Sequence, residues 1–259
     1  MTAKAHSFEP LLNAPGHEEA ALLALSRSAA PHVFIDFEFS VPHDRKEAAL
    51  TTTITALQSL DWSGKTVSVR VNGLAELSTF HEIGELVAAR LPALRAILFP
   101  MAETAYDVAA IDRYLTVCEG RAGSTTPLKL EILIETPRAL VEIDSIARAS
   151  SRIDTLHFGA GDFAKGMGIS VQPPGTPHPE YGLWDKNQTF HPGDIWHFAL
   201  MKLSVTARAF GLRAFDGPYV ALSDLDGYEQ QCRRSRALGL AGKWAITEAQ
   251  VKAAARLNA

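Results

Sequence analysis

Short runs of hydrophobic residues recur along the chain and alternate with longer segments in which hydrophobic residues return every three or four positions. The short runs have the length and composition of buried strands, and the longer segments have the spacing of amphipathic helices. Strands that alternate with helices pair in parallel, because the chain must cross back over the sheet before each new strand. Eight strands are expected, at residues 11–14, 33–38, 66–71, 96–99, 130–134, 153–158, 212–215 and 243–246.

Eight repeats of a strand followed by a helix predict a closed (β/α)₈ barrel, the TIM barrel of the α/β class. The length of 259 residues suits one such barrel, and no shift in composition marks a second domain, so we expect a single domain over residues 1–259. An open, doubly wound sheet is the alternative. The chain has no GxGxxG or GxxxxGK[ST] stretch that would favour a nucleotide-binding sheet of that kind.

One segment between the sixth and seventh strands departs from this alternation. Residues 170–194 are polar and rich in proline and glycine. Such a segment cannot build a hydrophobic core, so we interpret it as an active-site loop or a contact between subunits.

Charge and composition narrow the classes of partner. The net charge of −4 argues against a general nucleic-acid binder and against binding to acidic membranes. Cys118 and Cys232 are the two cysteines, and they lie far apart in the chain, which indicates a reducing cytoplasm rather than a disulfide framework. No signal peptide is evident, and no apolar run approaches the roughly 20 residues that span a bilayer. We expect a cytoplasmic protein without nucleic-acid or membrane partners.

Acidic residues follow two strands that are consecutive in the chain. Glu135 comes directly after strand 130–134, and a Gly-Ala-Gly turn joins strand 153–158 to Asp162. In a parallel barrel these carboxyl ends lie side by side, and carboxylate oxygens are the ligands that Mg²⁺ prefers. We predict that Glu135 and Asp162 bind one Mg²⁺. The competing interpretations are a structural ion pair for Glu135 and an ordinary tight turn at Asp162.

Further polar or small residues stand at strand ends and should face the same mouth. Arg70 has the planar guanidinium that binds a carboxylate by two parallel hydrogen bonds. Asp36 and Glu38 are candidate bases, with a metal-bound water as the alternative. A metal chelated by a 2-oxo acid would stabilise the enolate formed when a neighbouring carbon–carbon bond breaks. The small residues and the proline expected to line the substrate are Gly159, Ala160, Gly161 and Pro218.

Several stretches resemble the HpcH/HpaI aldolase and citrate lyase family, in particular its branch of citrate lyase beta-subunit-like and malyl-CoA lyase-like proteins. The resemblance covers nearly the whole chain and implies a (β/α)₈ barrel, Mg²⁺ on Glu135 and Asp162, and Arg70 on the substrate. It also implies aldol- or Claisen-type cleavage, often of a CoA thioester, in a homotrimer or hexamer. The stretches that carry it include LEILIETPRAL (130–140) and LHFGAGDFAKGMG (156–168), and the most specific are FHPGDIWHFALMKLSVTARAFGLRAFDGPY (190–219) and GLAGKWAIT (239–247).

Four features depart from the pattern of that family. Phe39 stands where lyases usually have Asp and HpaI-type aldolases have a basic His, and Met101 stands where Lys is common. Thr247 replaces the His of an Ile-His-Pro motif. We also expect a barrel without the extra carboxyl-terminal lid domain of malyl-CoA lyases.

The leading hypothesis is a Mg²⁺-dependent carbon–carbon lyase or aldolase that acts on a small 2-oxo acid or a short acyl-CoA thioester. Two alternatives stay open. One is a non-catalytic, ligand-binding accessory subunit that keeps the pocket for the metal and the oxo acid. The other is an aldolase that cleaves hydroxy-oxo acids without CoA.

Overall fold

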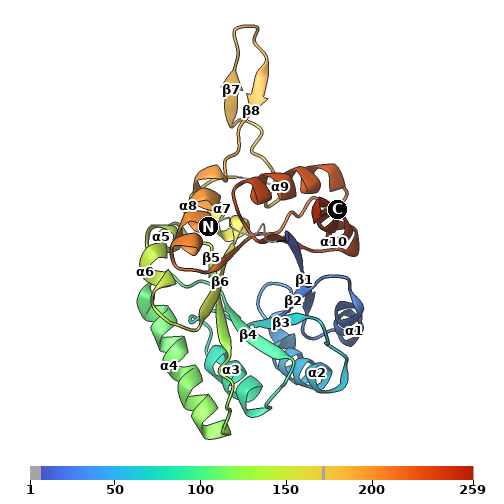
Figure 1. The fold of residues 1–259 in the computed structure, drawn as a ribbon, viewed down its shortest axis with the longest axis vertical. Coiled ribbons are helices and arrows are strands. Elements are labelled where there is room, and N and C mark those ends of the chain that lie inside the picture. Colours follow the sequence, from blue (N-terminus) through green and yellow to red (C-terminus); the bar gives the residue numbers. More distant parts are fainter. Residues whose placement is uncertain (1–6, 171–172, 259) are drawn as a thin grey trace.

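A computed structural model describes residues 7–170 and 173–258 of the chain (Figure 1). The elements follow one another as β1 (Glu9–Pro15), α1 (Glu19–Arg27), β2 (His32–Asp36), η1 (His43–Arg45), α2 (Lys46–Ser59), β3 (Thr66–Arg70), α3 (Ser78–Ala88), β4 (Leu94–Phe99), α4 (Ala105–Ala122), β5 (Lys129–Ile134), α5 (Pro137–Val141), α6 (Ile143–Ala147), β6 (Ile153–Phe158), α7 (Ala160–Gly166), β7 (Gly182–Trp184), β8 (Phe190–Pro192), α8 (His197–Ala209), β9 (Arg213–Asp216), α9 (Leu225–Ala237), β10 (Gly242–Ala245), α10 (Glu248–Ala255) and η2 (Arg256–Asn258).

Eight of the strands form one closed parallel barrel, which confirms the predicted (β/α)₈ fold. The order around the barrel is β1-β10-β9-β6-β5-β4-β3-β2, and β1 closes it by pairing with both β2 and β10. The helices surround this barrel (Figure 1). Since all eight strands run the same way, their carboxyl ends meet at one mouth.

Alternation along the strands divides the apolar side chains between two cores. Successive residues of a strand point to opposite faces, so Leu12 and Val33 pack outward against the helices while Leu11 and Phe34 point into the barrel. The interior is filled by side chains from six strands, so the barrel is a packed core rather than a pore. These are Leu11, Phe34, Leu98, Leu133, Phe215 and Trp244.

A polar layer lies inside the same barrel around the buried carboxylate of Glu131. Its Oε1 accepts hydrogen bonds from Ser68 Oγ at 2.6 Å and His32 Nε2 at 3.0 Å, and its Oε2 lies 3.0 Å from His157 Nε2. The Trp244 indole, which can only donate, gives its N–H to His157 Nδ1 at 2.9 Å. His157 Nδ1 is therefore an acceptor, and the proton of a neutral His157 stands on Nε2, where it donates to Glu131.

These partners govern the ionisation of the layer. Burial alone would raise the pKa of Glu131, but His32 and His157 hold it well below its ordinary value. Burial also lowers the pKa of His157. A charged carboxylate with hydrogen-bond donors on both oxygens is the arrangement that lets a charge persist in a barrel core.

The structure differs from the sequence-based expectation in three places. The helix expected after Thr136 is two short helices, α5 and α6, that meet at Glu142. The Gly-Ala-Gly turn opens the short helix α7, which begins at Ala160. In the segment 170–194, whose residues 171 and 172 lie outside the described residues, β7 and β8 pair as an antiparallel hairpin instead of forming an irregular loop.

Two expectations from the sequence, on the cysteines and on membrane-spanning segments, can be compared with the described residues. Cys118 and Cys232 are both free thiols. Within residues 7–170 and 173–258, no helix has the length and apolar character needed to cross a membrane.

Glu131→Gln tests the polar layer. The amide N–H₂ of Gln would face at least one imidazole N–H, so a buried donor would lose its acceptor, and we expect a loss of about 3 kcal/mol in the free energy of unfolding. Urea unfolding at pH 7 measures this loss, with the exposed Glu47→Gln as the control. Because the folded-state pKa of Glu131 is depressed, its stabilisation is present above its ordinary pKa and is lost as the pH falls. The difference between wild type and variant should therefore shrink on acidification below pH 4.5.

Candidate active site

The mouth of the barrel gathers the charged residues expected from the sequence. Asp36 and Arg70 are the last residues of β2 and β3, Glu135 follows β5, and Asp162 lies in the first turn of α7. The charges of Arg70, Glu38 and Asp162 all act on the ionisation of Glu135. The predicted acids and the arginine thus lie close enough together at the mouth for their charges to influence one another.

Asp36 and Arg70 form the best-ordered pair at this mouth. Arg70 Nε and Nη2 donate to the two oxygens of Asp36 at 2.7 and 2.8 Å. The same carboxylate accepts from the backbone N–H of Glu38 at 2.9 Å, and from the N–H and hydroxyl of Ser40 at 2.9 and 2.6 Å. Although burial opposes it, this set of donors, led by Arg70, lowers the pKa of Asp36. Asp36 is thereby held ionised as the anchor of Arg70.

The guanidinium of Arg70 is further fixed by aromatic rings and by a second acid. Its central carbon lies 5.5 Å from the ring centre of Phe34 and 5.7 Å from that of Trp244, within the range of cation–π attraction. Nη1, the nitrogen that Asp36 does not bind, forms an ion pair with Glu38 Oε2 at 2.9 Å. Burial is the largest influence on Glu38 and raises its pKa, despite the charge of Arg70.

Glu135 is a buried carboxylate with an incomplete set of protein partners. Its Oε1 accepts the backbone N–H of Met101 at 2.8 Å, and burial raises the pKa of Glu135 to about 8. Gly159 packs against it so closely that a Cβ there would lie 2.4 Å from Glu135 Cβ and 2.7 Å from Oε2. A side chain at position 159 would therefore displace the carboxylate.

The residues expected to line the substrate have different surroundings. The N–H of Gly159 donates to the carbonyl of Ile134 at 3.0 Å, so this amide is not free for a substrate. Ala160 and Gly161 lie in the first turn of α7, where no helical carbonyl precedes their N–H groups. The carbonyl of Pro218 lies against Gly175, which has a φ of +85° and no space for a Cβ.

Three groups at this mouth escaped the sequence reasoning. The backbone N–H of Met101 donates to Glu135, and Met101 has a φ of +55°, two backbone features that its side chain does not signal. Lys46 Nζ donates to the carbonyls of Phe37 and Glu38 at 2.8 and 3.0 Å, and so shapes the turn that carries Glu38. Trp244 contributes a ring from β10, and only the barrel closure places that ring beside Arg70.

Asp216 is the last residue of β9, and its side chain is buried. It binds Lys243 Nζ, Arg234 Nη2 and Ser235 Oγ, each at 2.7 Å. Against the effect of burial, the charges of Lys243 and Arg234 lower the pKa of Asp216 to about 2. Since these partners come from β10 and α9, Asp216 joins the barrel to that helix.

The structure shows the surroundings of two residues that depart from the family pattern, Phe39 and Thr247. Phe39 is 84% exposed on the rim of the mouth, so it neither fills a core nor supplies a proton. Thr247 caps α10, because its side chain accepts the backbone N–H of Gln250 at 3.2 Å.

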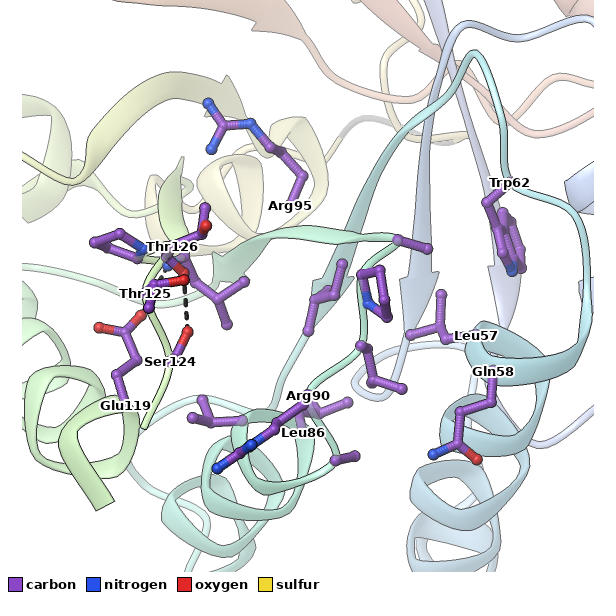
Figure 2. Close-up of a pocket in the computed structure, with 18 of the residues that line it drawn as sticks. Leu57, Gln58, Trp62, Leu86, Arg90, Arg95, Glu119, Ser124, Thr125 and Thr126 are labelled. Atoms are coloured by element: carbon purple, nitrogen blue, oxygen red, sulfur yellow. Dashed lines mark hydrogen bonds between the residues drawn. The ribbon is translucent and has the colours of Figure 1, made fainter. Parts of the chain in front are cut away.

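Grooves occur at both ends of the barrel. One of about 490 Å³ adjoins Glu38, Asn72, Gly73 and Met101 and offers room for a substrate at the mouth. A larger one, of about 1080 Å³, lies at the opposite end, where β3, β4 and β5 begin (Figure 2). Its Lys65 is bound to the carbonyls of Ser28 and Ala30, and its Glu119 to Arg152. Lys65 and Glu119 are thus engaged in contacts that stabilise the fold. The smaller groove is the one that lies beside the candidate active-site residues at the carboxyl ends of the strands.

The mouth of the barrel thus sets several carboxylates around one anchored arginine. The model of the HpcH/HpaI aldolase/citrate lyase family matches residues 11–247, and the chain belongs to this family, as its sequence motifs had indicated. It is an enzyme of the carbon–carbon lyase type.

The similarity to individual relatives is extensive. The chain is 35% identical over 237 residues to an L-malyl-CoA/beta-methylmalyl-CoA lyase of Cereibacter sphaeroides, which covers 92% of this chain and 74% of that one. It is 29% identical to a (3S)-malyl-CoA thioesterase of the same species, over 98% of this chain and 78% of that one. Protein CitE of Mycobacterium tuberculosis, crystallised with magnesium and acetoacetate, has the same fold, with a TM-score of 0.74 at 21% identity and coverage of 100% and 92%.

Gly159→Ala tests the packing at Glu135. The added methyl group overlaps the Glu135 side chain, so we expect a loss of about 2 kcal/mol in stability and a displaced carboxylate. Gly120→Ala is the matched control, since nothing lies near its Cβ position in α4 and Ala favours a helix by roughly 1 kcal/mol over Gly. Thermal unfolding should move in opposite directions for the two variants. A Gly159→Ala protein as stable as wild type, with Glu135 unmoved in its crystal structure, would contradict this assignment.

Proposed function

We propose that the chain is a Mg²⁺-dependent carbon–carbon lyase that cleaves or forms a short acyl-CoA thioester, with a small 2-oxo acid as the other reactant. The observation that carries this proposal is the buried carboxylate of Glu135, set beside Asp162 and the anchored Arg70. Membership of the lyase family, and the relatives that act on malyl-CoA, support the choice of substrate class.

The donor set at the mouth fits a hard cation. Among the described residues, no group of three or more His, Cys, Asp or Glu side chains is arranged to hold a metal ion. Two carboxylates are enough for Mg²⁺, which keeps several of its six positions for water and substrate oxygens. Burial raises the pKa of Glu135 although the charge of Arg70 opposes the shift, and a bound cation would add further positive charge beside this carboxylate. CitE provides a solved example of this fold with magnesium.

In this proposal Glu135 and Asp162 would hold the ion, and the ion would supply Lewis-acid chemistry toward the carbonyl oxygen of the 2-oxo acid. Arg70 binds a substrate carboxylate or carbonyl oxygen through Nη1 in place of Glu38, the ion-pair partner of Nη1 in the structure, while Asp36 keeps Nε and Nη2. The phenyl and indole rings of Phe34 and Trp244 exclude water from the buried side of the guanidinium and so strengthen that contact. Ala160 and Gly161 let the substrate approach the backbone.

The structure favours one of the two candidate bases. Asp36 accepts five hydrogen bonds and has a lowered pKa, so we assign it to positioning Arg70. Glu38 has a raised pKa, faces the groove at the mouth and contacts Arg70 Nη1. A carboxyl group of that kind can take a proton from the substrate carbon and return it, and we assign this step to Glu38.

We place the enzyme in the cytoplasm, where its two free thiols stay reduced.

Glu135→Gln tests the metal site. Removing one carboxylate charge from a two-carboxylate site should weaken Mg²⁺ binding at least 100-fold and reduce turnover at least 1000-fold, as roughly expected for a lost metal ligand. Titration calorimetry with Mg²⁺ and initial rates measure the two effects, and Asp162→Asn should reproduce them. Glu103→Gln, which changes another acid at the same groove, is the control and should retain both properties. A Glu135→Gln enzyme that binds Mg²⁺ and turns over normally would remove the assignment.

An assay with malyl-CoA and citramalyl-CoA tests the reaction class. Carbon–carbon cleavage releases a 2-oxo acid and leaves the thioester intact, so a phenylhydrazine assay should respond while a free-thiol assay does not. Thioester hydrolysis, the reaction named for one relative, would release free thiol without a 2-oxo acid. Retro-aldol cleavage of CoA-free hydroxy-oxo acids would indicate the CoA-independent aldolase. Binding without any product would indicate the accessory subunit.

A further inference from the structure

Trp244 on β10 joins the polar layer inside the barrel to the arginine at the mouth. Its indole N–H donates to Nδ1 of His157 at 2.9 Å, and the central guanidinium carbon of Arg70 lies 5.7 Å from its ring centre. The residue is buried, so both contacts are shielded from water. A side chain that touches both groups can transmit the geometry of the polar layer to Arg70.

The hydrogen bond to His157 fixes the orientation of the indole. Trp244 packs on Phe34 with ring centres 4.6 Å apart, but packing on a ring face does not decide which edge of the indole points into the barrel. The N–H lies on one edge only, so its donation to His157 selects one orientation. That orientation determines which part of the indole lies beside Arg70.

His157 is itself held in place within the polar layer. Its Nε2–H donates to Glu131 at 3.0 Å, its ring stacks on that of Phe215 at 5.4 Å, and it is fully buried. The negative charge of Glu131 polarises the imidazole and makes Nδ1 a stronger acceptor, because hydrogen bonds in a chain strengthen one another. Glu131, His157 and Trp244 therefore form a fixed series that runs from β5 through β6 to β10.

Stability alone does not account for a charged network in this core. A buried ionic network can often be replaced by apolar side chains of similar volume without loss of stability. The polar layer shares the barrel interior with Leu98, Leu133 and Phe215, which pack there without polar side-chain atoms. Because the series from Glu131 to Trp244 ends beside Arg70, the layer has a second role at the mouth.

Arg70 needs a support besides Asp36. A fork of two hydrogen bonds fixes the guanidinium within its plane but leaves the tilt of that plane open. The rings of Phe34 and Trp244 lie beside the guanidinium and limit this tilt. The tilt determines where Nη1, which lies 2.9 Å from Glu38 Oε2, directs its N–H groups.

We propose that Trp244 and His157 are positioning residues that set the tilt of Arg70, so that Nη1 points at the substrate. This role rests on the proposed function, in which Nη1 binds a carboxylate or carbonyl oxygen. Glu131 acts one step further back, by holding His157. Neither positioning residue needs to touch the substrate, so their removal should weaken the binding of the group that Arg70 holds.

Titration calorimetry with pyruvate, a small 2-oxo acid, at saturating Mg²⁺ tests this role. Trp244→Phe keeps an aromatic ring and removes the N–H, so we expect pyruvate to bind about 10-fold more weakly, a loss typical of one hydrogen bond or cation–π contact. The affinity for Mg²⁺ itself should not change. Trp62→Phe is the matched control, because it removes an N–H that donates to the carbonyl of Ala56 at 3.1 Å, beside the groove at the opposite end of the barrel. This control should bind pyruvate as wild type does.

A double-mutant cycle separates positioning from a general effect on the fold. His157→Phe leaves the indole without its acceptor and should also weaken pyruvate binding about 10-fold. Because His157 acts through Trp244, the variant with both changes should again lose about 10-fold, whereas independent effects would multiply to about 100-fold. Circular dichroism of each variant checks that the barrel is folded.

Each other outcome overturns the proposal. A wild type that binds no pyruvate at saturating Mg²⁺ would remove the proposed function as well, and this result is known before any variant is compared. Normal pyruvate affinity in Trp244→Phe, or an equal loss in Trp62→Phe, would remove the positioning role alone. Independent effects in the double variant would show that His157 does not act through Trp244. Trp244→Phe keeps the hydrogen bond from His157 to Glu131, so this variant decides the question if His157→Phe fails to fold.

Discussion

The ion pair between Asp36 and Arg70 is the interaction on which the mouth depends. These residues are direct partners in the register of β2 and β3, so the pair fastens two neighbouring strand ends at the point where the chemistry begins. It is buried, and a buried guanidinium is tolerated only when its charge and its donors are matched. Asp36 supplies the opposite charge and the acceptor oxygens for Arg70, and the rings of Phe34 and Trp244 lie beside its guanidinium. Once Arg70 is immobile, the positions of Glu38 and of the charge acting on Glu135 follow from it.

Much of the fold was accessible from the sequence because its pattern is regular. Buried parallel strands are short apolar runs, and the eight expected runs became the eight strands of the barrel. Glu135, Asp162 and Arg70 could be placed near one another since each follows or ends a strand. Asp216 also ends a strand, but its side chain points to the helix side, where Lys243 and Arg234 bind it. A position at the end of a strand thus predicts at which end of the barrel a side chain lies. Whether that side chain points into the barrel or toward the helices depends on a partner that is distant in sequence.

Other parts of the site are invisible to such reasoning. The N–H of Met101 is a backbone group, and its direction depends on a positive φ that Met rarely adopts. The polar layer around Glu131 joins three strands through His32, Ser68 and His157, none of which forms a motif with the others in sequence. The sequence-based interpretation of residues 170–194, an active-site loop or a contact between subunits, did not include the pairing of β7 with β8, because these strands are three residues long and flanked by proline and glycine. Short pairing of that kind leaves no periodicity to detect.

The closure of the barrel determines at which stage of synthesis and folding the surroundings of Arg70 are complete. β1 pairs with β2 and also with β10, whose residues are separated from it by most of the chain. Trp244, one of the two rings beside Arg70, sits on β10, and its indole also sets the tautomer of His157. During synthesis, Phe34, Asp36 and Arg70 emerge early, but the ring of Trp244 arrives only with the last strand. A nascent or truncated barrel therefore holds its arginine open to water, and competence for substrate is acquired in the final step of folding.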